Sequence, residues 1–178
     1  MFDPKKPIKA LTVWQPWACL LAVGIKTVEN RTWSPTKGGL VIGDFVAIHA
    51  GASYHAEEWQ YVVELKKKLD TLGRWNTKRD RPWAIKSGKP NPEADPSSDT
   101  TPYGAIIGVA VLDEIRKAPR SFTDQHGTYA DPFWSGPVGW YLRDPVPFEA
   151  VPCAGMQGLW TPSEGVLSLV RERYKAAA

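Results

Sequence analysis

The sequence has little cysteine and no long apolar run. Its two cysteines, Cys19 and Cys153, form no Cys-x-x-Cys pair, so we expect neither a disulfide framework nor a structural zinc site. The longest near-continuous apolar run, residues 105–112, is far shorter than the ~20 residues of a membrane helix. Residues 1–10 lack the apolar core of a secretory signal. The default expectation is a cytoplasmic protein that does not contact a membrane.

The excess of positive charge is also small. Twenty-two Lys and Arg against 19 Asp and Glu give a formal net charge of +3, which does not by itself indicate nucleic-acid binding. Nine tryptophans, in contrast, are many for 178 residues. The 15 glycines and 16 prolines make up about 17% of the chain, against about 12% in average proteins. This composition favours short strands and loops around an aromatic-rich core or cleft.

The expected elements are those of a mixed α+β domain in which strands outnumber helices. Alternating or continuous apolar residues predict strands at 11–14, 26–33, 40–49, 103–115 and 138–142, followed by a proline-broken stretch at 144–157. Helical spacing predicts a short helix between Pro16 and Gly24, an amphipathic helix over 54–72, and a last helix that begins at the Thr161-Pro162-Ser163-Glu164 capping sequence. A small closed or half-closed barrel is the expected architecture.

We expect a single domain, 1–178, interrupted by an insertion at 74–102. This stretch contains five prolines and many Ser, Thr, Asn and Asp residues with little periodicity, so it is expected to be partly disordered. Its first half is basic and also contains Trp75 and Trp83, which is consistent either with nucleic-acid contact or with a solvated loop. The candidate phosphate contacts are Arg74, Lys78, Arg79 and Arg81.

The most specific pattern is Gly-x-Lys-x-x-Glu-x-Arg over residues 24–31, directly after the short predicted helix. On the strand that follows, Glu29 and Arg31 share one face. A lysine such as Lys26, held near an apolar wall, can act as a base or as an electrophilic clamp. A carboxylate can accept hydrogen bonds from the exocyclic amine of cytosine or adenine. The structural alternative is an ion pair between Glu29 and Arg31 that only fixes the strand.

This motif resembles the ASCH domain family, which is part of the PUA-like superfamily. The longer members of the family share further blocks with this sequence: Gln15-Pro16-Trp17-Ala18, Ile48-His49-Ala50, residues 136–140 and residues 157–160. The resemblance implies a PUA-like β-barrel or pseudo-barrel with about three flanking helices, and a cleft beside the helix that precedes the motif.

The resemblance also implies RNA or a modified nucleoside as the partner. One reading is a protein that holds a nucleobase in the cleft, and the other is a hydrolase, acting on N4-acetylcytidine-type nucleosides or on RNA. In the family's amidohydrolases the motif lysine corresponds to Lys26, while the threonine nucleophile falls where this sequence has Glu29. Here Glu29 could instead activate a water, with Lys26 stabilising the oxyanion. A protein-binding module is the third reading.

These arguments give a set of candidate residues. The candidate catalytic residues are Lys26 and Glu29. The candidate ligand-binding residues are Gln15, Trp17, Lys26, Glu29, Arg31, Trp33, Gln157 and Trp160. Gln157 could read a base edge or satisfy a turn, and a tryptophan that stacks on a base contributes about 1–3 kcal/mol. His49, His126 and Asp131 lack metal-ligand spacing, so we expect no metal and no cofactor.

Overall fold

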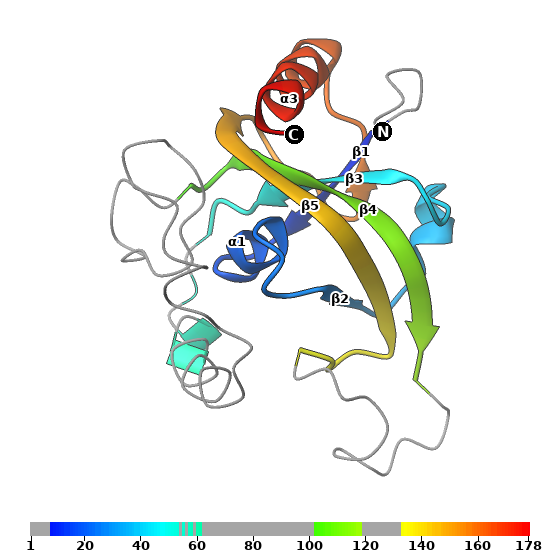
Figure 1. Ribbon diagram of the computed structural model, residues 1–178. Helices are drawn as coiled ribbons and strands as arrows, with labels where there is room; N and C mark the ends of the chain where they lie inside the picture. The colour runs from blue at the N-terminus through cyan, green and yellow to red at the C-terminus, as the bar shows by residue number, and fades with distance from the viewer. Residues whose placement is uncertain (1–7, 54, 56, 59, 62–101, 119–132) are drawn as a thin grey trace.

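The computed structural model describes residues 8–53, 55, 57–58, 60–61, 102–118 and 133–178 (Figure 1). One six-stranded sheet, in the order β2-β5-β4-β3-β1-β6, forms its centre. The strands are β1 (Lys9–Val13), β2 (Val28–Arg31), β3 (Phe45–Ala50), β4 (Ala105–Lys117), β5 (Val138–Pro152) and β6 (Leu159–Trp160). The helices are α1 (Trp17–Ala22), the 3-10 helix η1 (Pro35–Gly38) and α3 (Glu164–Ala177).

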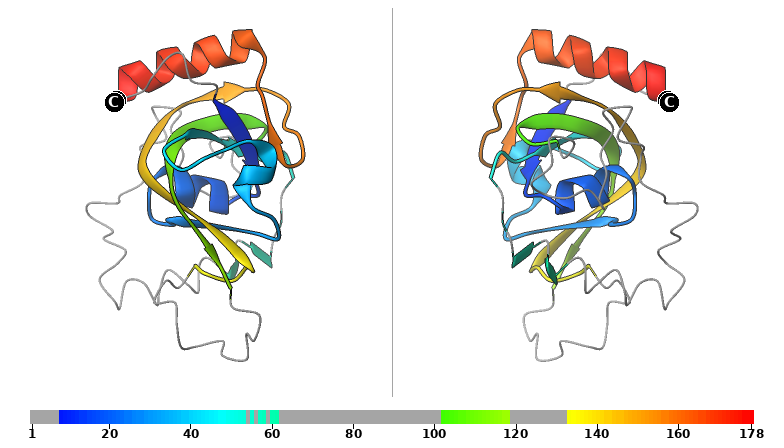
Figure 2. Two further views of the ribbon diagram at one scale, coloured as in Figure 1. Left: turned by 90° about the vertical axis from the view of Figure 1, so that its right-hand side faces the viewer. Right: turned by 90° about the vertical axis from the view of Figure 1, so that its left-hand side faces the viewer.

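The sheet curls around α1 (Figure 2). β1 and β3 pair in parallel, and the other neighbouring strands pair antiparallel. The long β4–β5 ribbon bends through the whole curl and its ladder shifts register at three places. Such irregularities bend and twist a strand pair, which is how an open sheet closes toward a barrel. The observed architecture is the half-closed α+β barrel that the sequence predicts.

Helix α1 fills the inside of the curl. Five of its six residues are buried, among them Cys19, which packs in the core. The helix comes close to β4 at Gly108, where an added Cβ would lie 3.1 Å from the Cβ of Ala22. Gly24 then takes a positive φ of 78°, so the chain leaves the helix and turns toward β2. The expected helix therefore exists, although Pro16 caps it instead of forming its first turn.

Helix α3 covers the outer side of the sheet, where it packs mainly on β5 (Figure 1). A second core lies beneath it, formed by residues that include Ala47, Phe148, Leu167 and Val170. Ser163 caps the helix by accepting a hydrogen bond from the Val166 N–H. The helix thus begins at Glu164, the last residue of the predicted capping sequence, because the extended Ser163 is the residue that caps it.

Strand β5 corrects the prediction of a short strand followed by a proline-broken stretch. It runs without interruption over 15 residues and includes Pro145 and Pro147. Beyond Tyr141 no described strand pairs with the β2 side of β5, and the ladder with β4 is irregular. Proline is tolerated at such free edges and irregular positions because no regular ladder hydrogen bond is lost there. β3 also starts later than predicted, at Phe45, after a turn.

Two α-helices are fully described, and residues 57, 58, 60 and 61 are helical as well. The rest of the predicted 54–72 helix lies outside the described residues, as does the predicted insertion at 74–102. Within the described part of the chain, no helix is long and apolar enough to cross a membrane.

Replacing Leu167 by alanine should destabilise the protein. Leu167 is 3% exposed in the core beneath α3, and truncating a buried leucine costs about 2–5 kcal/mol. Leu169 on the same helix is 45% exposed, so Leu169→Ala should change the free energy of unfolding by less than about 0.5 kcal/mol. The urea midpoint, with an unchanged m value, measures both effects. Equal losses in the two variants would contradict the assigned packing face.

Candidate functional site

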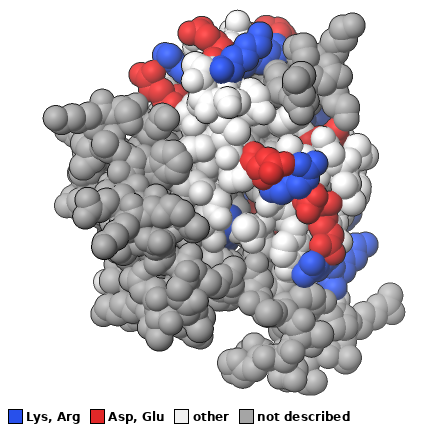
Figure 3. Space-filling view, in the orientation of Figure 1, with Lys and Arg blue, Asp and Glu red and all other residues white. Residues whose placement is uncertain are grey.

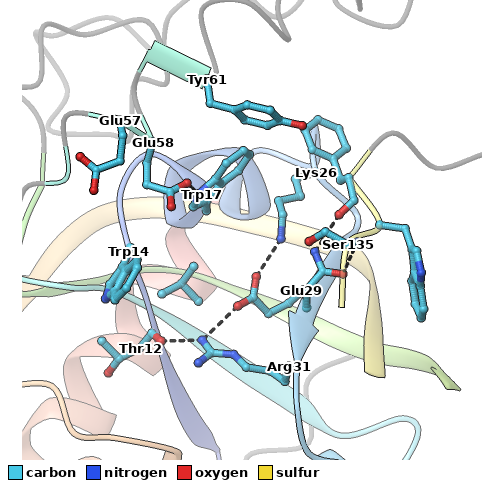
Figure 4. Close-up of a pocket in the computed structure, with 14 residues that line it drawn as sticks. Thr12, Trp14, Trp17, Lys26, Glu29, Arg31, Glu57, Glu58, Tyr61 and Ser135 are labelled. Atoms are coloured by element: carbon cyan, nitrogen blue, oxygen red, sulfur yellow. Dashed lines mark hydrogen bonds and ion pairs between the residues drawn. The ribbon is translucent and has the colours of Figure 1, made fainter. Parts of the chain in front are cut away.

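A pocket of about 620 Å³ opens beside the start of α1 and strand β2 (Figure 4). Its walls come from segments far apart in the sequence: the end of β1, α1, β2, the helical residues near 58 and the segment before β5. The described lining residues are Thr12, Val13, Trp14, Trp17, Lys26, Glu29, Asn30, Arg31, Glu57, Glu58, Tyr61, Phe133, Trp134 and Ser135.

A chain of charged groups forms the floor of this pocket (Figure 4). Lys26 Nζ lies 2.8 Å from Glu29 Oε2, and Arg31 Nη2 lies 3.0 Å from Glu29 Oε1. The lysine and glutamate side chains are only 5% and 8% exposed. Burying a carboxylate is costly without close partners, because the ion loses its contacts with water. Glu29 has one cation on each oxygen.

The same chain of groups joins the edge strand β2 to strand β1 across the curled sheet. Arg31 Nη2 also donates a hydrogen bond of 2.7 Å to the backbone oxygen of Thr12. Arg31 is on β2, at one edge of the sheet, while Thr12 is on β1, four strands further along the strand order. The interaction therefore spans the opening of the barrel, and the floor of the pocket is also the place where the curl is closed.

The local sequence explains how the motif reaches this position. After Gly24, the Lys26 N–H donates to the Leu20 oxygen at 3.1 Å, which folds the chain back against α1. Val28 then packs with Leu20 and Phe133 in a small core of its own. Since side chains alternate along a strand, Glu29 and Arg31 point to the other face of β2, into the pocket.

Asn30 is a residue of the pocket that sequence reasoning missed. Its Nδ2 donates to the Phe133 oxygen at 2.7 Å, and its Oδ1 accepts from the N–H groups of Ser135 and Gly136 at 3.0 and 3.1 Å. One side chain thus fixes the segment that carries Phe133 into the pocket wall. The available signal was an asparagine inside the motif, because asparagine commonly bonds to backbone groups.

Aromatic side chains form the wall above the charged floor. The Trp17 ring centroid lies 5.8 Å from Lys26 Nζ, a cation–π distance, and 6.4 Å from the Phe133 ring. Trp17 Nε1 donates to Glu58 Oε2 at 2.6 Å, which ties the helical segment to α1. Tyr61 from that segment packs on Trp17 with 5.8 Å between the ring centroids. The pocket is therefore apolar on its wall and ionic on its floor.

A second pocket, of about 530 Å³, adjoins the first. The two share Thr12, Trp14 and Arg31 in their linings. The other residues that line the second pocket are Trp33, His49, Ala52, Gly155, Met156, Gln157 and Gly158. His49 is buried there with its Nε2 3.1 Å from the Cys153 oxygen, and burial lowers the pKa of this histidine, so its neutral form is favoured.

The structure divides the candidate residues of the sequence into four groups. Trp17, Lys26 and Glu29 line the first pocket, Trp33 and Gln157 line the second, and Arg31 lines both. The remaining candidates line neither pocket or lie outside the described residues: Gln15, Trp160, Arg74, Lys78, Arg79 and Arg81.

Gln15 and Trp160 have structural partners. The buried Gln15 amide donates to the Pro102 oxygen at 2.7 Å and accepts from the Cys19 N–H at 3.2 Å, which anchors the start of α1. Trp160 Nε1 donates to Thr12 Oγ1 at 3.2 Å, and its ring belongs to the core beneath α3. Among the described residues, no three His, Cys, Asp or Glu side chains gather as metal ligands would; His126 and Asp131 lie outside these residues.

The fold and the site define a class of protein: a small α+β pseudo-barrel with a polar pocket beside the helix that precedes the motif strand. The sequence model of the ASCH domain matches residues 11–132, and the chain belongs to the ASCH domain family. The family and the fold predicted from the sequence are both confirmed. The ASCH domain is a PUA-like fold that often binds RNA.

Solved structures similar to this chain include two of the ASCH protein from Zymomonas mobilis, both at 14% sequence identity. A tyrosine-to-phenylalanine variant of that protein has a TM-score of 0.49 over 94% of this chain and 98% of its own. The unsubstituted protein has a TM-score of 0.47 over 96% of each chain. No curated protein matches the sequence.

The charged floor predicts a measurable coupling between Lys26 and Glu29. Lys26→Met removes one of the two cations that hold the buried carboxylate, so it should cost about 1–3 kcal/mol of unfolding free energy. In the double variant with Glu29→Gln the loss should be about 0.5–3 kcal/mol smaller than the sum of the single losses. A double-mutant cycle by urea unfolding measures this difference. Additive losses would show that the two groups do not interact in solution.

Proposed function

We propose that the first pocket binds the base of a nucleoside or of an RNA nucleotide. The main support for this proposal is the buried ion pair of Lys26 and Glu29, which lies below the aromatic wall of the pocket. An ammonium group has three N–H donors and a carboxylate has about four acceptor positions, so both groups keep hydrogen-bonding capacity beyond their mutual contact. A donor and an acceptor side by side match the edge of a base that carries an amine next to a ring nitrogen.

The positions of the donor Lys26 and the acceptor Glu29 predict which bases the pocket prefers. Glu29 would accept from the exocyclic amine of cytosine or adenine, while Lys26 would donate to the neighbouring ring nitrogen. A buried site made for such an amine rejects a base without it, because the carboxylate is then left unpaired. Trp17 and Phe133 provide apolar surface against which the base can pack.

The charged residues that line the first pocket favour binding of the base over binding of the phosphate. Glu57 and Glu58 are among the described lining residues, in addition to Glu29. A phosphate in this pocket would face three carboxylates, against the two cations Lys26 and Arg31. A neutral base meets no such repulsion.

Titration calorimetry with the four ribonucleosides tests the proposal. The protein should bind cytidine or adenosine, and Glu29→Gln should weaken that binding at least tenfold, about 1.4 kcal/mol, because the amide replaces one acceptor oxygen by a donor and removes the negative charge. Glu114→Gln is the matched control, since Glu114 pairs with Arg116 on β4 and lines neither pocket. An unchanged affinity in Glu29→Gln, or no nucleoside binding by the parent protein, would contradict the proposal.

A second candidate function is hydrolysis of an acylated base such as N4-acetylcytidine. The distance of 2.8 Å between Lys26 Nζ and Glu29 Oε2 favours it, because a base and an oxyanion-stabilising cation would act on the same carbonyl group. Glu29 would take a proton from water as the water oxygen attacks the acetyl carbon. The C–N bond would then break, the amine nitrogen would take up the proton from Glu29, and acetate and cytidine would leave.

Chromatography of cytidine after incubation with N4-acetylcytidine tests this second candidate. An enzyme should release cytidine, and Glu29→Gln should lower the rate at least a hundredfold, within the range attributed to general-base catalysis. Glu114→Gln should retain the full rate. If the parent protein binds the nucleoside and releases no cytidine, hydrolysis is excluded and the binding function stands.

A further inference from the structure

The two pockets form a continuous surface. They meet at Thr12, Trp14 and Arg31, which line both. Figure 4 shows Arg31 and Thr12 on the opposite side of Glu29 from Lys26. A ligand that fills the first pocket from Lys26 to Arg31 therefore ends at the border of the second pocket, which adds about 530 Å³.

The two pockets differ in charge. Glu29, Glu57 and Glu58 belong to the lining of the first pocket, whereas the described lining of the second contains no Asp or Glu. Arg31 is the one Lys or Arg among the described residues that line the second pocket. A phosphate is therefore repelled from the first pocket and attracted to the second, at the border where Arg31 stands.

Arg31 keeps donors for such a group. Its Nη2 contacts Glu29 Oε1 and the Thr12 oxygen, and its buried Nε has no hydrogen-bond partner among the described residues. A guanidinium has five N–H donors in a planar fork that suits phosphate oxygens. A buried N–H donor without a partner is costly, and an anion at the border would supply the acceptor.

An exposed aromatic ring stands at the same border. Trp14 is 53% exposed, and one side of its indole stacks on His55 with 4.1 Å between the ring centroids and 23° between the planes. Trp33, in the second pocket, is held edge-on against Trp140 at 4.7 Å. Ordered aromatic rings beside a cation are the usual elements of a single-strand binding surface.

Acidic and basic side chains that pair with one another cover the face that carries the β4–β5 ribbon. Figure 3 shows acidic and basic side chains next to one another there. Arg143 pairs with Asp113 and Asp144, and Arg116 pairs with Glu114. Because these bases are neutralised, the described residues of that ribbon offer no run of positive charge to a polyanion.

We infer that the two pockets are adjoining subsites for a single-stranded oligonucleotide. This inference rests on the proposed function: the first pocket holds one base, Arg31 contacts the phosphate that follows it, and the second pocket receives the neighbouring nucleotide beside Trp33 and Gln157. The ligand class is thus an oligonucleotide of two or more nucleotides, for which a free nucleoside supplies only half of the contacts.

Calorimetry with cytidine, a cytidine-containing dinucleotide, and RNA and DNA pentamers of one sequence tests the inference. The dinucleotide and at least one pentamer should bind at least tenfold more tightly than cytidine. Only their affinity should fall with salt, with a slope of about −0.7 for each phosphate neutralised. The RNA and DNA pentamers identify the sugar, and tighter binding of either supports the inference.

Gln157→Asp places a carboxylate in the second pocket at an exposed position and leaves the first pocket unchanged. It should weaken oligonucleotide binding at least tenfold with cytidine binding unaltered. Ser168→Asp adds the same charge on the exposed side of α3 and should alter neither affinity. Cytidine binding without tighter oligonucleotide binding, or an oligonucleotide affinity insensitive to Gln157→Asp, overturns the inference and leaves the proposed function intact. No binding of any ligand overturns both.

Discussion

The buried carboxylate of Glu29 is the group on which the rest of the site depends. It is only 8% exposed, and Lys26 contacts one of its oxygens while Arg31 contacts the other, which offsets the cost of burying a carboxylate. Arg31 in turn reaches the Thr12 oxygen, so the ion pairs on β2 also tie that edge strand to β1 and close the curl of the sheet. Stability and the proposed ligand recognition therefore depend on the same three side chains, and we expect a change in any one of them to affect both.

The surrounding fold brings this charged group to a solvent-open pocket. α1 fills the curl and ends at Gly24, which delivers Lys26 directly to the edge of the barrel. Asn30, between Glu29 and Arg31, binds the segment that brings Phe133 into the wall. Strand β2 thus directs Glu29 and Arg31 into the pocket, and its Asn30 side chain fixes the segment that contributes Phe133 to the wall. The wall then shields one side of the floor, which strengthens the interactions that the charged groups make with each other and with a ligand.

Much of the fold follows from local patterns in the sequence. The buried strand β4 and the terminal helix follow from apolar periodicity, and the end of α1 follows from a glycine that can adopt a positive φ. The continuous strand β5 does not follow from such patterns, because its prolines locally predict the end of a strand. They are tolerated because no described strand pairs with the β2 side of β5 at these positions. The start of β3 is likewise set by a turn, and the apolar pattern of the sequence does not predict the length of that turn.

The sequence by itself determined the motif chemistry: the spacing of Glu29 and Arg31 on a strand predicts that a carboxylate and a guanidinium share one face, shortly after Lys26. Only the tertiary structure decided which distant residues meet them. It buried Gln15 as an anchor of α1 and set Trp14 at the border of two pockets. The reason is physical: spacing along a strand fixes the direction of neighbouring side chains, whereas a pocket wall depends on how strands far apart in sequence pack across the closed sheet.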